Sequence, residues 1–149
     1  MKQVSEIMTR EVVTVKPSTN VRELARLFTT HRIGSIPVVD DAGTLLGIVT
    51  ESDLVEQDQS LHIPTVVSLF DWVIYLESDR KFEEQLKKIT AQSVADIYTR
   101  QVETVAPATP LTEVADLMAK KKVHALPVVE GGRLVGMVSR IDLIRTMVD

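Results

Sequence analysis

The chain has 149 residues, enough for one ordinary domain or for two half-sized units that share a core. Its hydrophobic and charged fractions, 44% and 26%, are globular values, and the net charge of -4 disfavours nucleic acid and anionic membranes as default partners, since both require a basic surface. Cysteine is absent, which excludes disulfides, a thiol nucleophile and cysteine metal sites.

Neither the N-terminal segment nor the most apolar run predicts a place in a membrane. The start, MKQVSEIMTR, has no positive region followed by an apolar stretch, so we expect no secretory signal. The run from Ile63 to Leu76 is too short to span a bilayer and is interrupted by Ser68 and Asp71. We therefore expect a cytoplasmic protein with no membrane as partner.

The first half of the chain predicts five elements in the order β-α-β-β-α. A short apolar strand ends at Pro17, because proline fixes φ and cannot donate a ladder hydrogen bond. A helix follows, then two strands joined by a turn of acidic residues and glycine, and then a last helix. The marker residues are Val12 to Val15 for the first strand, Leu24, Leu27 and Phe28 for the helix, Ile36 to Val39 and Leu45 to Val49 for the hairpin, and Ser52 for the start of the last helix.

A segment from about Glu56 to Ser93 has no counterpart elsewhere in the chain. It holds Trp72, and its second part places Phe82, Leu86 and Ile89 on one helical face. We expect a helical insertion and not a flexible linker. It either packs over the core of the protein, covers a cleft or extends a homodimer surface.

The second half repeats the first. VADIYTRQVETVAPATPLTEVADLM, from Val94, matches VSEIMTREVVTVKPSTNVRELARLF, from Val4. Thr109 before Pro110 predicts an N-cap with proline at the first helical position. Since one unit has too little core to be stable alone, we expect the two sheets to pack together with pseudo-two-fold symmetry. The matching elements are Val102 to Val105, a helix with Val114, Leu117 and Met118, the strands Leu126 to Val129 and Leu134 to Val138, and a helix from near Ile141.

These paired motifs resemble a tandem pair of CBS domains, a Bateman module of the stand-alone type. The resemblance rests on IPVVD and LPVVE, on GIVT and GMVS, and on TESDL and SRIDL, each occurring once per half. It covers most of the chain outside the insertion. It implies an α+β fold with two CBS repeats, at 1–55 and 94–149, packed through their sheets, and with the helical insertion at 56–93.

The resemblance also implies a function. Members of this family bind adenosine-containing ligands, commonly AMP, ADP, ATP or S-adenosylmethionine, in the cleft between the repeats, and they regulate another protein. We therefore expect an allosteric adenine-nucleotide sensor that requires no cofactor, forms a homodimer and acts on an unidentified regulated protein. One alternative is a sensor of S-adenosylmethionine, with Ile7 and Met8 near the Asp53 site. Another is a ligand-free dimeric assembly protein that acts through the insertion.

Two matched acidic residues are the candidate ribose ligands. Asp53 and Asp142 each fall in the first turn of a predicted helix, and a carboxylate there can accept hydrogen bonds from a cis-diol. Thr50 and Ser139 place a hydroxyl beside them. The same Ser/Thr-x-x-Asp pattern is a helix cap, and the two roles can coexist.

The other wall of each pocket is expected at the start of the hairpin. Gly34 permits close approach of the backbone, and neighbouring apolar side chains would enclose the adenine, although core packing is the alternative for them. Two threonines in the first strands are similar to family positions at the pocket mouth. The candidates are Thr14, Ile33, Gly34, Ser35, Ile36 and Pro37 in the first repeat, and Thr104, Val123, His124, Ala125, Leu126 and Pro127 in the second.

Basic residues are distributed unequally between the two sites. The first has His31 and Arg32 as possible phosphate contacts, with Glu51 where the second has Arg140. We predict that the Asp142 site favours more phosphate charge, the alternative being a solvated basic helix end. The second site gathers Lys120, Lys121, Lys122, His124 and Arg140.

Catalytic motifs are not found in the sequence. No Walker loop, GxGxxG or Ser-His-Asp order occurs, and the three histidines lack metal-ligand spacing. The sequence therefore predicts no enzyme, no catalytic residue and no metal site.

Overall fold

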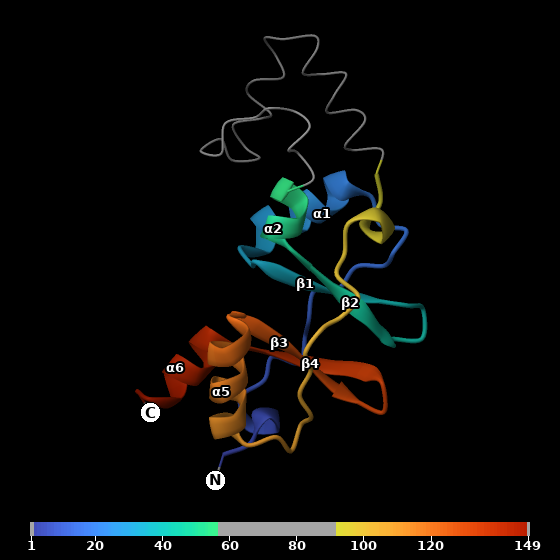
Figure 1. Cartoon of the computed structure of the whole chain (residues 1–149). Helices are drawn as coiled ribbons and strands as arrows, with labels where there is room; N and C mark the ends of the chain where they lie inside the picture. Colours follow the sequence, from blue (N-terminus) through green and yellow to red (C-terminus); the bar gives the residue numbers. More distant parts are fainter. Residues whose placement is uncertain (1, 57–91, 149) are drawn as a thin grey trace.

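The computed structural model describes residues 2–56 and 92–148 (Figure 1). The predicted insertion therefore lies almost wholly outside the described residues. Each half of the chain forms the same elements in the same order, which confirms the α+β prediction. They are η1 (Val4–Glu6), α1 (Val21–His31), β1 (Ser35–Val39), β2 (Leu45–Thr50) and α2 (Glu51–Glu56), then η3 (Val94–Asp96), α5 (Leu111–Lys121), β3 (Ala125–Glu130), β4 (Arg133–Ser139) and α6 (Arg140–Thr146).

Two antiparallel hairpins lie in the middle of the molecule, with α1 and α2 outside one and α5 and α6 outside the other (Figure 1). β1 pairs with β2 and β3 with β4, with a register shift after Val38 and after Val128. The turns meet, since the Leu45 amide donates to the Gly132 carbonyl and the Leu134 amide to the Gly43 carbonyl, both at 3.0 Å. The repeats are thus joined by backbone hydrogen bonds as well as by packing.

The predicted first strand of each repeat is reduced to one bridging residue. Val15 pairs in parallel with Val38, and Val105 with Val128. The flanking residues do not continue either ladder, so Val12 to Val15 and Val102 to Val105 are wrong as full strands. One residue is enough to bury an apolar side chain, since Val15 and Val105 are 4% and 7% exposed.

The first helices of the two repeats start differently. α1 follows Asn20, whose side chain accepts a hydrogen bond from the Glu23 amide at 2.7 Å. α5 follows Pro110, which is itself the N-cap. The prediction of Thr109 as N-cap is wrong, because its hydroxyl accepts from the Ala106 amide at 2.9 Å in the preceding turn.

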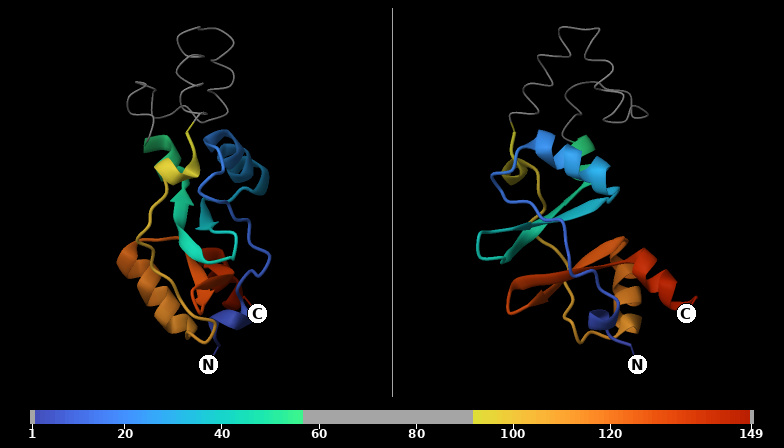
Figure 2. Two further views of the ribbon diagram at one scale, coloured as in Figure 1. Left: turned by 90° about the vertical axis from the view of Figure 1, so that its right-hand side faces the viewer. Right: turned by 180° about the vertical axis from the view of Figure 1, so that it is seen from behind.

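Each repeat completes the core of the other. The η1 helix packs on the second repeat, where the Val4 amide donates to the Thr109 carbonyl, and η3 packs on the first, where the Val94 amide donates to the Thr19 carbonyl. Val4 and Val94 are fully buried. Figure 2 shows η1 beside α5 and η3 beside α1. Each packed unit therefore contains a short helix from the other repeat of the sequence.

Two glycines let the segment around Thr99 lie against β2 and the segment around Thr9 lie against β4. Ile48 in β2 exchanges backbone hydrogen bonds with Thr99 at 2.9 and 2.8 Å, and Thr9 exchanges them with Met137 in β4. A Cβ on Gly47 would lie 2.2 Å from the Thr99 carbonyl oxygen, and one on Gly136 would lie 2.7 Å from the Met8 sulfur. Side chains at these two positions would separate the segments from the strands.

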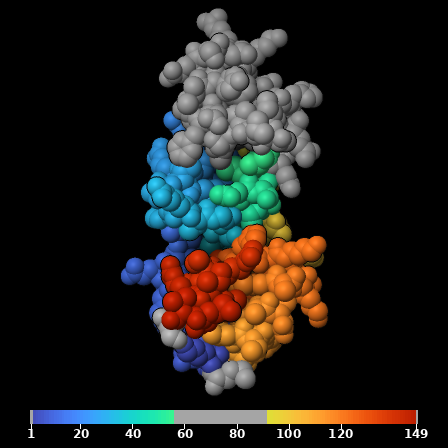
Figure 3. All heavy atoms as spheres, turned by 90° about the vertical axis from the view of Figure 1, so that its left-hand side faces the viewer, coloured from blue at the N-terminus to red at the C-terminus, as the bar shows by residue number. Residues whose placement is uncertain are grey.

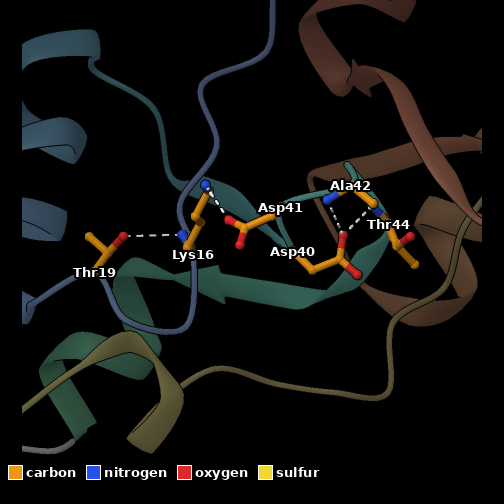
Figure 4. A network of polar contacts seen from close by, with 6 residues as sticks. All are labelled: Lys16, Thr19, Asp40, Asp41, Ala42 and Thr44. Carbon is orange, nitrogen blue, oxygen red and sulfur yellow. Dashed lines mark hydrogen bonds and ion pairs between the residues drawn. The ribbon is translucent and has the colours of Figure 1, made fainter.

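The hairpin turn of the first repeat carries a polar network (Figure 4). Asp40 accepts hydrogen bonds from the amides of Ala42 and Thr44, both at 2.9 Å, and Asp41 forms an ion pair with Lys16. Asp40 thus satisfies two backbone donors of the turn, and the predicted turn of acidic residues and glycine is confirmed. None of the helices in the described part of the chain is long and apolar enough to cross a membrane.

Candidate functional site

The two candidate ribose ligands sit in helix caps of the same kind. The Thr50 amide donates to Asp53 Oδ2 at 2.9 Å, and the Asp53 amide donates back to the Thr50 hydroxyl at 3.2 Å. The Ser139 amide donates to Asp142 Oδ2 at 2.8 Å, and the Asp142 amide donates to the Ser139 hydroxyl at 3.3 Å. This is the capping box, so the capping interpretation is confirmed. It engages one oxygen of each carboxylate.

The other oxygen of each carboxylate has a different neighbour in each repeat. Asp53 Oδ1 accepts from the Thr99 hydroxyl at 3.5 Å, and Thr99 belongs to the segment from the second half of the sequence that is paired with β2. Asp142 Oδ1 lies 3.8 Å from Arg145 Nη1, one turn further along its own helix. Sequence reasoning missed both neighbours. The signal for Thr99 is the threonine that recurs in MTR and YTR. The signal for Arg145 is its spacing of three residues from Asp142.

The predicted pocket walls lie beside these caps. Ser35 pairs with Thr50 in register, and Ala125 pairs with Ser139. The Glu51 amide donates to the Gly34 carbonyl at 3.1 Å. The hairpin start and the helix start are thus brought together in both repeats. Gly34 itself is exposed, and a Cβ there would meet nothing nearer than the Glu51 carboxyl at 3.8 Å.

The apolar wall residues divide by burial. Ile36 and Leu126 are 0% and 1% exposed and belong to the two core clusters, so core packing holds for both. Pro37 and Pro127 are buried with them. The remaining candidates are accessible to different degrees: Ile33 and Val123 are half-buried against the clusters, whereas Thr14 and Thr104 are exposed.

The basic residues of the second repeat do not all gather at Asp142. Arg140 Nη1 lies 2.7 Å from His124 Nδ1, and because a guanidinium only donates, this ring nitrogen accepts. Lys121 instead pairs with Glu103 at 3.5 Å. His31, Arg32 and Lys120 are exposed.

A groove between α5 and α6 takes in several of these basic residues. Its volume is 570 Å³, and Figure 3 shows the face of the molecule that carries α6. Ser139 and Asp142 are not among its lining residues, so the groove is distinct from the capped carboxylate. The lining comprises Ala115, Met118, Ala119, Lys122, Val123, His124, Arg140, Leu143 and Ile144.

A smaller pocket of 220 Å³ lies at the other end of the hairpins, near their turns. Thr104 lines it, together with Gly47 and Arg100, whose guanidinium stacks over the Tyr98 ring at 4.9 Å. This pocket places Thr104 apart from Asp53 and Asp142. Among the described residues, no three His, Asp or Glu side chains are grouped so as to hold a metal ion.

Comparisons with known proteins agree on one family. A family model described as CBS domain matches residues 4–60 and 94–149. Protein MJ1426 of Methanocaldococcus jannaschii is 32% identical over 155 residues, spanning 97% of this chain and 90% of that one. Chloroplastic CBSX2 of Arabidopsis thaliana is 32% identical over 137 residues, spanning 88% and 56%. A crystal structure of CBSX2 in complex with AMP superposes with a TM-score of 0.76 at 27% identity, covering 99% of this chain and 97% of that one.

Proposed function

Because the chain belongs to the CBS-domain family, with one domain in each half, we propose that it is a regulatory module that binds an adenine nucleotide between its repeats. The observation that carries the proposal is the position of Asp53 Oδ1. This oxygen lies outside the cap and 3.5 Å from the hydroxyl of Thr99, which is paired with Ile48 in β2. A ribose diol that donates to it would contact the first repeat and the segment that leads into the second.

Such contact gives a physical route to regulation. Since Thr99 lies on the segment that leads from the first unit into the second repeat, a ligand that contacts both Asp53 and Thr99 would favour one position of that segment, and so of the second repeat, over another. A ligand signals only through such a difference in affinity, and couplings of this kind are typically about 1–3 kcal/mol. The regulated protein would then bind one of the two positions better.

AMP, ADP and ATP are the ligands we propose first. The crystal structure of CBSX2 in complex with AMP supports this choice, since that chain is covered almost completely by this one. S-adenosylmethionine is the second adenosine ligand to test, but the expectation that Ile7 and Met8 lie near the Asp53 site is wrong, because both pack against the core of the second repeat. We predict that the Asp142 site favours more phosphate charge. Arg140 and His124, on which this prediction depends, line the groove between α5 and α6, and Asp142 does not line that groove.

We further propose that the module works as a homodimer. Val55 on α2 is 54% exposed, and Ile141 and Ile144 on α6 are 54% and 49% exposed. Apolar side chains on outward-facing helices support an isologous contact between two copies. Sedimentation analysis tests this, and a monomer at micromolar concentration would contradict it.

The binding proposal is tested by calorimetry with AMP, ADP, ATP and S-adenosylmethionine. Asp53→Asn and Asp142→Asn are the sharpest variants, because an amide oxygen can still accept the capping bond while the second oxygen becomes a donor. The doubly substituted protein should lose about ten-fold or more in nucleotide affinity, as expected for hydrogen bonds to a charged group. Unchanged affinity would overturn the ribose assignment.

The chain offers a matched control. Asp96 forms the same box in η3, where its Oδ2 accepts from the Ser93 amide at 3.1 Å, outside the proposed site. Asp96→Asn should leave nucleotide affinity unchanged. If no adenosine ligand binds the wild-type protein while it forms a tight dimer, the assembly role replaces the sensor.

A further inference from the structure

The carboxylate of Asp142 is more fully engaged than that of Asp53. Asp142 is 8% exposed, and its Oδ2 accepts from both the amide and the hydroxyl of Ser139, at 2.8 and 3.0 Å. Its Oδ1 forms the ion pair with Arg145. Both oxygens therefore already have partners within α6 and its N-cap.

Asp53 has a different neighbour on the corresponding oxygen. Its Oδ1 accepts from the hydroxyl of Thr99 at 3.5 Å. The position three residues further on, which Arg145 occupies in the second repeat, is Glu56 in the first and carries no positive charge. Among the ion pairs of residues 2–56 and 92–148, none involves Asp53.

We propose that Arg145 makes the Asp142 site the weaker ribose site and so sets which of the two sites fills first. This rests on the proposed function. A ribose diol offers donors to the free oxygen of the carboxylate. The guanidinium of Arg145 is also a pure donor, so it competes with the diol for that oxygen.

Thr99 does not compete in this way. A hydroxyl donates one hydrogen bond and can accept two, so Thr99 can turn to accept from the ligand while the diol takes Asp53 Oδ1. At the first site the ligand therefore displaces a hydroxyl that can then accept a hydrogen bond from it, whereas at the second it displaces a guanidinium that cannot.

The size of the effect follows from exposure. The Arg145 side chain is 73% exposed and its distance of 3.8 Å is that of a loose ion pair. Exposed pairs of this kind change an equilibrium by at most about five-fold. The second site should therefore be weakened and not closed.

The test isolates each site and then removes the guanidinium. AMP affinity is measured by calorimetry for Asp53→Asn, which leaves the second site, and for Asp142→Asn, which leaves the first. Arg145→Gln is then added to each. In the Asp53→Asn protein it should strengthen AMP binding by up to about five-fold, and in the Asp142→Asn protein it should change nothing. Arg145→Lys, which keeps the charge, should behave like the parent.

Arg26 supplies a matched control, since it pairs with Glu23 at the same i, i+3 spacing on α1, at 3.4 Å. Arg26→Gln should leave AMP affinity unchanged in both proteins. Weaker or unchanged AMP binding after Arg145→Gln in the Asp53→Asn protein would overturn the inference and leave the sensor proposal standing. Failure of the wild-type protein to bind AMP, ADP, ATP or S-adenosylmethionine would overturn both.

Discussion

At the starts of α2 and α6 the two repeats use the same backbone hydrogen bonds and opposite charges. Thr50 with Asp53 and Ser139 with Asp142 form the same box. The residue that follows the hydroxyl is Glu51 in one repeat and Arg140 in the other, and both are exposed. The box needs a hydroxyl and a carboxylate at fixed spacing, and it makes no demand on this residue. Side chains that complete the backbone are therefore alike in both repeats, and the charge around them is set independently.

The segments that cross to the other repeat lie against a glycine in each case: the one at Thr99 against Gly47, and the one at Met8 and Thr9 against Gly136. We expect Gly47→Ala to cause a large loss of stability, about 3 kcal/mol or more, because the added Cβ meets a backbone carbonyl oxygen at 2.2 Å. Denaturant unfolding measures this loss. Gly136→Ala should cost less, since the nearest atom, at 2.7 Å, belongs to the flexible Met8 side chain, and the nearest backbone atom, the Thr9 carbonyl oxygen, lies further away at 2.9 Å.

Gly34→Ala is the control for both substitutions. The nearest atoms to a Cβ there are those of the Glu51 carboxyl at 3.8 Å, an ordinary contact. Its stability should stay within about 0.5 kcal/mol of the wild type. Equal losses at Gly34 and Gly47 would show that the close approach of the crossing segment is not what requires glycine in β2.

Loss of the side-chain cap of α1 should lower stability by a smaller amount, and only the first repeat has this cap. Asn20→Ala removes the side-chain acceptor of the Glu23 amide and should cost about 1 kcal/mol in a denaturant titration. Asn20→Asp keeps an acceptor and should retain the stability of the wild type. A loss as large in Asn20→Asp as in Asn20→Ala would show that the amide group acts through some other contact.

The sequence predicts the local elements well because they depend on local patterns. The hairpins and helices follow from apolar spacing and turn residues, and the hairpin strands and the starts of α2 and α6 lie within one residue of their expected positions. The interlocking of η1 and η3 does not follow, since nothing in the pattern of a short apolar segment such as the one at Val4 indicates which repeat it packs on. The prediction of Thr109 as the N-cap of α5 is wrong because its hydroxyl accepts from the Ala106 amide in the preceding turn.

The candidate site divides in the same way. The carboxylates of Asp53 and Asp142 were found because their spacing from Thr50 and Ser139 is fixed by one turn of helix. Thr99 could not be found from spacing, since its contact with Asp53 depends on how the second repeat crosses the first. A duplicated sequence therefore predicts where two sites lie better than it predicts how they differ.

The smallest difference between the repeats lies in the hairpin turn. The hydrogen bond and charge of Lys16 hold the pKa of Asp41 below its ordinary value of 3.8. Ala106 and Gly131 stand at the matching places in the second repeat, so this pair has no counterpart there. Because the folded pKa is the lower one, the pair stabilises the fold fully above the ordinary pKa, and this contribution is lost as pH falls through the folded value. Asp41 is fully exposed, so the effect should be small.

Thermal melts of the wild type and Asp41→Asn from about pH 2 to pH 7 measure this contribution. The wild type should melt slightly higher at neutral pH, and the difference should shrink on acidification, because protonation of Asp41 removes the charge that Lys16 attracts. Lys16→Gln should reproduce the loss, and high salt should reduce the difference, as for any exposed pair. If the difference instead grew on acidification, the stabilising form of Asp41 would be the protonated one, and the turn would be held by its hydrogen bonds at Asp40 without help from the ion pair.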